Sequence, residues 1–441
     1  MNNSGYFMDT IFAPICSLGG SIVSVRFSGS DAYRVFDFFK ISKDLYSSKD
    51  LFFTKLVYNG NLLDEVVIKI FRKPHSFTGE DVVEIDLHAS YIILKDFLKL
   101  VSSIPNFRFA KNGEFSKRAF LNGKIDLIKA EGINAIIKAE TKKQQQLANE
   151  MFGGKIYKRY NDIRDKLLHA LSFIEVNIDF SEEEIPQHVI NEVKDITKNL
   201  ISELTVCIND KAVIDKINNG ISVAIIGKPN VGKSTLLNWL AKRDVAIVSP
   251  IAGTTRDVLH VDLELDGYKV IFYDTAGIRD SDNLIEQEGI KRARDIERNA
   301  DLCIYIFDDV LMDKDLENLK RDNSIIVLNK SDLRNFKNCN KNCIEISLLK
   351  NKNLDILLDT IKKHVVNIVE MKQNPMVMNE RHNLLLLQCV DILKNIDFEK
   401  QPIEIIGEEL RIASDKIGQI IGKIYTEDVL DIIFSKFCIG K

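Results

Sequence analysis

Residues Val223 to Leu237 read VAIIGKPNVGKSTLL, and this stretch decides the fold of the central part of the chain. An apolar run leads into a glycine-rich loop, and the loop opens a helix. Gly227 and Gly232 bracket four residues and are followed by Lys233 and Ser234, the GxxxxGK[ST] spacing of a phosphate-binding loop. We expect the backbone N–H groups and the helix N-terminus to surround phosphates, Lys233 to neutralise them, and the Ser234 hydroxyl to ligate Mg2+.

Glycine-rich turns before helices also occur for structural reasons, so the assignment depends on motifs further along the chain. Asp274-Thr-Ala-Gly277 follows an apolar run at 270–273, and its aspartate can hold Mg2+ through water. Between the loop and this aspartate, Gly253-Thr254-Thr255-Arg256-Asp257 places Thr255 to supply a second hydroxyl to Mg2+.

A third motif indicates which base is bound. Asn329-Lys330-Ser331-Asp332 follows the apolar run at 325–328. The Asp332 carboxylate can accept two hydrogen bonds from the N–H edge of guanine, an edge that adenine does not offer. Four motifs in this order predict a GTP site.

Length and composition limit the number of domains and the class of protein to be expected. A chain of 441 residues predicts about three domains, and 45% hydrophobic with 28% charged residues is ordinary for a globular protein. A net charge of -4 means that any nucleic-acid contact is local or shared with a partner. No signal peptide or long apolar segment is evident, and the seven cysteines lack CxxC pairs, so we expect a cytoplasmic protein with reduced thiols and no membrane contact. Cys339 and Cys343 alone do not favour a zinc site.

The hydrophobic pattern divides the chain into four segments. Residues 1–124 carry short apolar runs at 22–27, 51–57, 64–71 and 82–87 and predict an α+β domain. Residues 125–217 and 370–441 show helical spacing, including a stripe from Leu410 to Ile424 and a last helix that Thr426 caps. Residues 218–369 alternate strands with helices, with a hairpin turning at Asp266-Gly267. The predicted fold is a multidomain α/β protein in which a Ras-like P-loop GTPase domain is inserted into a discontinuous α-helical domain.

The whole chain resembles the MnmE (TrmE) family of bacterial tRNA-modification GTPases. The resemblance rests on Ser76-Phe-Thr-Gly-Glu-Asp-Val-Val-Glu84, Gly113-Glu-Phe-Ser-Lys-Arg-Ala-Phe-Leu-Asn-Gly-Lys124, the GTP motifs, Glu409-Leu-Arg411 and the final Phe-Cys-Ile-Gly-Lys. It implies an N-terminal domain that dimerises and binds a tetrahydrofolate one-carbon donor. It also implies a heterotetramer of the homodimer with the flavoprotein MnmG, which modifies carbon five of wobble uridine in tRNA.

The same resemblance implies roles for residues that pattern alone leaves open. Arg26, Glu84, Lys124 and Lys441 are implied as folate contacts, and Cys438 as a functionally sensitive tail cysteine. On pattern alone, these N-terminal residues, like His75 and His88, fit a structural role better than a functional one.

The GTPase site departs from the Ras pattern, because Ile278 stands where Ras-type enzymes carry a water-positioning glutamine. The resemblance implies Glu286 as the group that orients water, beside the catalytic Lys233, and K+ in place of an arginine finger. The implied K+ ligands are Asn230, Ser249, Ile251 and Thr254. The expected GTP contacts are Asn230, Val231, Gly232, Lys233, Ser234, Thr235, Ser249, Thr254, Thr255, Asp274, Thr275, Ala276, Gly277, Asn329, Lys330 and Asp332.

Some positions differ from the family pattern. Ala89-Ser90 replaces two glycines that the family usually has, and Asn112 replaces a proline. Ser347-Leu348 replaces the usual Ser-Ala beside the guanine base. Two other functions stay open on the sequence. One is a ribosome-assembly GTPase, although no GxxG loop in a basic setting is found outside the nucleotide site. The other is a protein that holds GTP without hydrolysing it.

Overall fold

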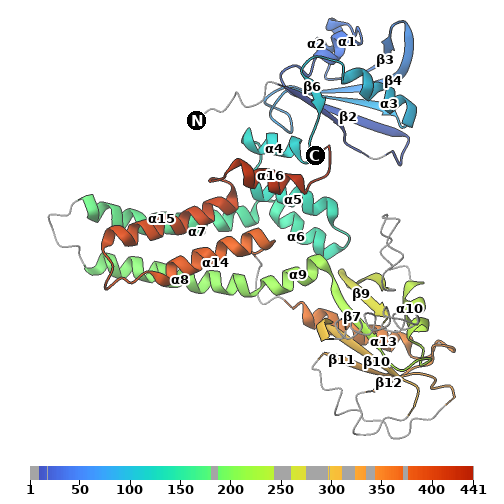
Figure 1. Cartoon of the computed structure of the whole chain (residues 1–441), viewed down its shortest axis with the longest axis vertical. Coiled ribbons are helices and arrows are strands. Elements are labelled where there is room, and N and C mark those ends of the chain that lie inside the picture. Colours follow the sequence, from blue (N-terminus) through green and yellow to red (C-terminus); the bar gives the residue numbers. More distant parts are fainter. Residues whose placement is uncertain are drawn as a thin grey trace, which may run out of the picture. The chain divides into compact units, whose positions relative to one another are not determined.

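The structure is a computed structural model, and it describes residues 9–16, 18–179, 187–242, 260–274, 296, 298–309, 323–333, 343–370 and 376–440. The chain forms two compact units. Met1–Asn134, Met151–Arg164 and Ile417–Lys441 form unit 1, and Ala135–Glu150 with Asp165–Lys416 form unit 2. Figure 1 labels the elements of both units.

Unit 1 contains a six-stranded sheet in the order β3-β4-β5-β2-β1-β6. Its strands are β1 (Thr10–Pro14), β2 (Ile22–Ser28), β3 (Leu51–Tyr58), β4 (Asn61–Phe71), β5 (Val82–His88) and β6 (Phe107–Phe109). The pairs are antiparallel except β1 with β6, which is parallel. The four apolar runs predicted in this part of the chain are therefore strands, and β1 and β6 were not predicted.

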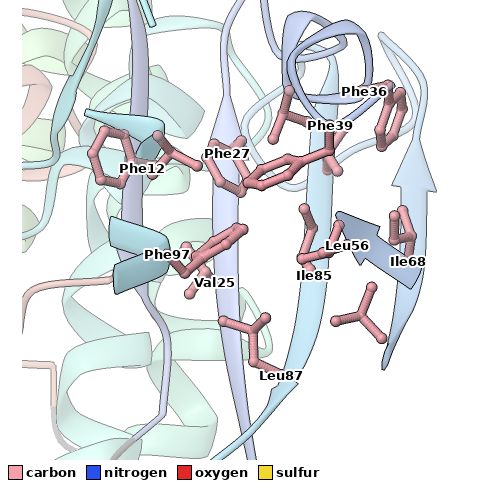
Figure 2. Close-up of a cluster of buried hydrophobic side chains, with 14 of the residues drawn as sticks. Phe12, Val25, Phe27, Phe36, Phe39, Leu56, Ile68, Ile85, Leu87 and Phe97 are labelled. Atoms are coloured by element: carbon pink, nitrogen blue, oxygen red, sulfur yellow. The ribbon is translucent and has the colours of Figure 1, made fainter. Parts of the chain in front are cut away.

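One face of this sheet carries the hydrophobic core of unit 1. Alternate residues of each strand point to the same face, and those of one face are almost fully buried. They pack with side chains of α1 (Arg34–Phe38) and α3 (Tyr91–Val101), while α2 (Lys43–Ser48) adds half-buried residues at the edge. Figure 2 shows Phe27, Phe39 and Phe97 at the centre of this core. The opposite face of β2 and β5 carries the polar residues Arg26 and Glu84.

Helices complete unit 1. They are α4 (Glu114–Leu121), the start of α5 (Leu127–Lys138), the start of α7 (Lys155–Asp179), the end of α15 (Ile403–Ile421) and α16 (Glu427–Ser435). Phe120, Leu127 and Phe434 belong to one buried cluster that joins α4, α5 and α16. Thr426 lies at the N-cap of α16 as predicted, but its side chain accepts no capping hydrogen bond. Gly422, with a φ of +80°, follows α15, so Ile424 lies beyond the helix in which we expected it.

The helical part of unit 2 is built from segments on both sides of the nucleotide domain in the sequence. It contains α6 (Lys142–Phe152), α8 (Gln187–Asn209), α9 (Lys211–Asn219) and α14 (Glu380–Asn395), with most of α7 and α15. α8 lies beside α14, as Figure 1 shows, and Arg411 of α15 pairs with Glu175 of α7 at 2.8 Å. Helical spacing was predicted for residues 125–217, and in α7 the apolar residues at this spacing, such as Ile156, Ile163 and Ile174, are buried. The helical domain is therefore discontinuous, as predicted.

The second sheet has the order β12-β11-β10-β7-β9-β8. Its strands are β7 (Ile221–Ile226), β8 (His260–Leu265), β9 (Tyr268–Asp274), β10 (Leu302–Phe307), β11 (Ser324–Leu328) and β12 (Cys343–Glu345). Only β8 runs antiparallel to its neighbour, in the predicted hairpin with β9. With α10 (Lys233–Ala241) and α13 (Leu354–Ile368) this is the Ras-like order, in which ligands bind at the carboxyl ends of the parallel strands.

Candidate functional site

The loop after β7 has the shape that a phosphate-binding loop needs. A Cβ atom added to Gly227 would lie 2.4 Å from the carbonyl oxygen of Ile306, and one on Gly232 would lie 2.5 Å from Asn329 Nδ2. Gly232 also has a φ of +111°, which favours glycine. Both glycines are therefore required for the loop to pack against the ends of β10 and β11. Its N–H groups then precede the nine-residue helix α10, whose N-terminus attracts anions.

Lys233 is held over this loop. Its ammonium group donates to the carbonyl oxygens of Gly227 and Lys228, each at 2.8 Å, and the residue is only 5% exposed. These bonds fix the charge at the mouth of the loop, where it is placed to neutralise phosphate oxygens. The predicted position of Lys233 is therefore consistent with the geometry.

Ser234 and Asp274 come together from different elements. Asp274 is fully buried at the end of β9, beside Ile225 of β7. The Ser234 hydroxyl, in the first turn of α10, donates to Asp274 Oδ2 at 2.6 Å. Neighbouring oxygens around Mg2+ lie about 2.9 Å apart, since the metal–oxygen distance is about 2.1 Å. The two side chains therefore fit Mg2+, with Ser234 as a direct ligand and Asp274 as the acceptor that orients the hydroxyl and metal-bound water.

The base-recognition motif begins at the end of β11. Asn329 is buried and fastens the loop, because its Nδ2 donates to the Val231 carbonyl at 2.8 Å. Its Oδ1 accepts from the Leu348 N–H at 3.2 Å. Leu348 is the position that departs from the family pattern beside the guanine base, and in this structure its N–H is directed to Asn329. Lys330 pairs with Asp308, which follows β10.

Asp332 is positioned by Ser347, a residue to which the sequence assigned no role. The buried Ser347 hydroxyl donates to Asp332 Oδ1 at 2.6 Å. This hydrogen bond lowers the pKa of Asp332 below its ordinary value of 3.8. An ionised carboxylate accepts hydrogen bonds only, which is what the two N–H donors of guanine require. The arrangement therefore suits guanine, which offers two N–H donors on one edge, better than adenine, which does not.

A second polar cluster lies in unit 1, on the face of the sheet opposite the core. Arg26 of β2 stands directly across from Glu84 of β5, and its Nε donates to Glu84 Oε1 at 2.8 Å. The guanidinium also lies 5.6 Å from the Phe77 ring and 5.5 Å from the Phe115 ring. Phe115 is fully buried, so the rings support the guanidinium, and the ion pair itself can hold a flat, polar heterocycle by hydrogen bonds and by stacking on the guanidinium plane. The sequence missed the two phenylalanines, although both lie in the stretches that carried the family resemblance.

The loop that carries Phe77 is anchored by buried charges. Arg118 of α4 is fully buried and its guanidinium contacts carboxylates of Asp9, Glu80 and Glu114 at 2.7–3.3 Å. Glu80 also accepts from Ser28 at 2.6 Å. Pairing of each buried charge makes the cluster stable, because an unpaired buried charge is strongly destabilising. The network therefore fixes the aromatic residues around Arg26.

Two of the other predicted folate and tail positions lie near this cluster. Lys124 donates to the Pro74 carbonyl at 2.8 Å, and its side chain lies against Gly79. Cys438 is exposed, and its carbonyl accepts from the Gly113 N–H at 3.3 Å. Gly440 approaches Pro14, whose strand neighbour Ala13 pairs with Arg26. Unit 1 thus brings Arg26, Glu84, Lys124 and the tail together. The candidate His88 instead pairs with the buried carboxylate of Asp64 at 2.7 Å.

Other predicted site residues fall outside the part of the chain that the structure describes. They are Ser249, Ile251, Thr254, Thr255, Thr275, Ala276, Gly277, Glu286 and Lys441. Of the remaining loop positions, Val231 is buried, and Asn230 and Thr235 are exposed. Among the described residues, no three His, Cys, Asp or Glu side chains gather as a metal site, and no helix is long and apolar enough to cross a membrane.

The second sheet and its loops define a Ras-like P-loop GTPase domain with a guanine-selective site. Two family sequence profiles match the parts of the chain on both sides of this domain as well. The profile described as "MnmE helical domain" matches residues 127–438, and "GTP-binding protein TrmE N-terminus" matches residues 10–124. The chain belongs to the MnmE (TrmE) family of tRNA modification GTPases.

Relatives of similar length support this membership. The tRNA modification GTPase MnmE of Rickettsia bellii (strain OSU 85-389) is 40% identical over 447 residues, which cover 98% of this chain and 100% of that protein. The protein of the same name from Rickettsia canadensis (strain McKiel) has the same identity and coverage. That of Rickettsia akari (strain Hartford) is 38% identical over 98% of this chain and 100% of its own length.

Proposed function

We propose that this GTPase is K+-stimulated and, with a flavoprotein partner, modifies carbon five of wobble uridine in tRNA with a tetrahydrofolate one-carbon donor. The observation that carries the proposal is the presence of two separate sites in one chain. Lys233, Ser234 and Asp274 suit a magnesium-bound GTP, and Arg26, Glu84, Phe77 and Phe115 suit a flat heterocycle. A GTPase that only switches has no need of the second site.

In the GTPase site, the described residues bind and orient the nucleotide. Lys233 and the loop N–H groups hold the phosphates, and Ser234 holds Mg2+, which withdraws charge from the phosphate oxygens. Asp332 fixes the base. The proposed K+ ligand Asn230 is exposed at the loop, with a φ of +64°. An amide oxygen there suits an alkali cation next to the β- and γ-phosphates. We further propose Glu286 as the group that orients the attacking water.

In unit 1, the proposed ligand is a reduced folate. Its ring would lie against the Arg26–Glu84 pair, whose guanidinium is backed by Phe77 and Phe115, and its acidic end would approach Lys124 and Lys441. We propose that Cys438, whose carbonyl accepts from the Gly113 N–H and whose side chain is exposed, acts in the modification step. We propose a homodimer formed through the N-terminal domain, a heterotetramer with the flavoprotein MnmG, and a cytoplasmic location. The domain limits 1–124, 125–217, 218–369 and 370–441 belong to the same proposal.

Two experiments test the proposal at different levels. GTP hydrolysis by the purified chain is expected to rise when Na+ is replaced by K+, and Asn230→Ala should remove the difference. Lys228→Ala, a neighbouring exposed loop substitution, serves as the control. Mass spectrometry of tRNA nucleosides from cells that lack the chain should show wobble uridine without the substituent at carbon five. Unchanged nucleosides would contradict the role in tRNA, and equal rates in both salts would contradict the role of K+.

A further inference from the structure

The polar face of the unit 1 sheet extends beyond Arg26 and Glu84. In the antiparallel pairing of β2 with β5, Arg26 stands opposite Glu84, and Ser24 stands opposite Asp86. Residues two apart in a strand point to the same face. Ser24 and Asp86 therefore form the next row on the face that carries the Arg26–Glu84 pair.

This second row contains two oxygen atoms whose hydrogen bonding is incomplete. The Ser24 Oγ and Asp86 Oδ1 atoms are buried and have no hydrogen-bond partner among the described residues. Ser24 is only 8% exposed. The other polar groups of these residues are satisfied, because Asp86 Oδ2 pairs with Lys69 at 2.7 Å and the Ser24 N–H donates to Cys16 Sγ at 3.1 Å. Buried polar atoms without partners are costly and rare, and they point to a bound group.

We propose that Ser24 and Asp86 recognise the amide edge of the ligand that binds beside Arg26 and Glu84. The Asp86 carboxylate oxygen accepts from a ring N–H, and the Ser24 hydroxyl donates to the adjacent ring carbonyl. Side chains directly opposite in a sheet have Cβ atoms about 5 Å apart, which suits two neighbouring ring atoms. The inference rests on the proposed folate site, because the pterin ring of tetrahydrofolate carries such an N–H and carbonyl side by side.

Charge assigns the orientation of the ligand. The row of Ser24 and Asp86 carries a carboxylate and lies on one side of the Arg26–Glu84 pair along the strands. On the other side β5 begins at Val82, after the loop whose Pro74 carbonyl binds Lys124. The acidic end of a folate is attracted by Lys124, whereas the charges of the second row are already paired between Asp86 and Lys69. The ring amide therefore points to Ser24 and Asp86, and the glutamate end points to Lys124.

The first test measures binding of tetrahydrofolate to the full chain by calorimetry under anaerobic conditions. Ser24→Ala and Asp86→Asn should each weaken binding about tenfold or more, the effect of losing one buried hydrogen bond. The affinity for GTP should not change. Ser414→Ala is a matched control, because Ser414 of α15 is also a buried serine whose hydroxyl has no partner among the described residues. It should leave tetrahydrofolate binding unchanged.

A second measurement separates ligand recognition from a structural role. Ser24→Ala should leave the melting temperature of the ligand-free chain unchanged or raise it, because it removes a buried hydroxyl without a partner. The wild type should also bind the 4-amino analogue more weakly than tetrahydrofolate, since the analogue lacks the ring carbonyl. In Ser24→Ala this difference in affinity between the two compounds should be smaller. A lower melting temperature with unchanged affinity would show that water satisfies these atoms and would overturn the inference.

The outcomes also distinguish the inference from the proposed function. Should Arg26→Ala weaken tetrahydrofolate binding while Ser24→Ala and Asp86→Asn bind like the wild type, only the inference fails. Should the wild type bind no tetrahydrofolate at all, the proposed folate site fails, and the inference fails with it.

Discussion

The hydroxyl of Ser234 and the carboxylate of Asp274 are joined by a hydrogen bond of 2.6 Å. The bond links the first turn of α10 to the end of β9, forty residues further along the chain. It presents one lone pair of the hydroxyl toward the phosphate side, because the hydroxyl hydrogen is given to Asp274. The hydroxyl that we propose as a magnesium ligand is thus oriented without any nucleotide.

This geometry predicts the effect of Asp274→Asn. The amide has one acceptor oxygen and no charge, so the Ser234 hydroxyl and metal-bound water are held less firmly. We expect GTP hydrolysis to fall about 100-fold or more, with more Mg2+ needed for half-maximal rate. Titration of hydrolysis with MgCl2 checks this. Asp266→Asn, in the hairpin turn, is the matched control and should behave like the wild type. Equal Mg2+ dependence in both variants would disprove the assignment.

The proposed pairing of Asp332 with guanine predicts that Asp332→Asn changes which nucleotide is preferred. In Asp332→Asn the side chain offers a donor and one acceptor, which complements the C2 carbonyl of xanthine rather than the amino group of guanine. Affinity for GTP should fall at least about 100-fold, the loss of two charge-assisted hydrogen bonds, and affinity for xanthosine triphosphate should rise. Competition binding with both nucleotides measures the change. Ser347→Ala should weaken GTP binding less, without favouring xanthine, because Asp332 stays but loses its positioning bond.

The charge network of unit 1 predicts loss of stability in acid. Burial alone would raise the pKa values of Asp9 and Glu114, but hydrogen bonds from Arg108 and the charge of Arg118 bring both below their ordinary values of 3.8 and 4.5. A carboxyl whose pKa is lowered in the folded state contributes stability above its unfolded pKa, and this is lost as the pH falls through the folded pKa. The free energy of unfolding should therefore be steady above about pH 5 and fall steeply below about pH 4.

Thermal melts followed by circular dichroism between pH 7 and pH 3 measure this dependence. Arg108→Gln should reduce the slope in acid, because it removes the main partner that lowers both pKa values. Arg411→Gln is a control, since Arg411 pairs only with exposed carboxylates of Glu175 and Glu408 among the contacts described for it. An acid slope that Arg108→Gln leaves unaltered would contradict the role of the network.

The close approach of Gly440 to Pro14 predicts that Gly440→Ala releases the C-terminal tail that carries Cys438. Gly440 has a φ of +91°, and a Cβ there would lie 2.3 Å from the Pro14 carbonyl oxygen. The substitution should detach the tail, so that the Cys438 thiol reacts faster with a maleimide reagent. Gly60→Ala is the matched control, because Gly60 has a similar φ of +82° but nothing within 4 Å of an added Cβ. Equal thiol reactivity in both variants would show that Gly440 does not hold the tail.

The central strands β7 and β10 of the nucleotide domain could be predicted closely because most of their residues are buried on both faces. β10 begins and ends where the apolar run does, at Leu302 and Phe307. The strands β1 and β6 of unit 1 were missed for a different reason. β6 has three residues, too few to show a period, and β1 reads TIFAP, without alternation of polar and apolar residues.

The candidate site residues also divide into those that local sequence motifs predict and those that only the folded structure brings together. Lys233, Ser234, Asp274 and Asp332 were found because their spacing within local motifs expresses the chemistry directly. The stacking of Phe77 and Phe115 on Arg26 joins segments far apart in the sequence, and so does the bond between Ser347 and Asp332. Such contacts depend on strand register and helix packing, which no local pattern specifies.

Unit 1 is assembled from Met1–Asn134, Met151–Arg164 and Ile417–Lys441. During synthesis on the ribosome, its sheet emerges first, but the segment carrying α16 and Gly440 emerges only after the whole nucleotide domain has been translated. Phe120 of α4 therefore stays exposed until translation has passed α16, whose Phe434 packs against it. Truncated or stalled products would carry a complete nucleotide domain and a unit 1 that lacks its last helix.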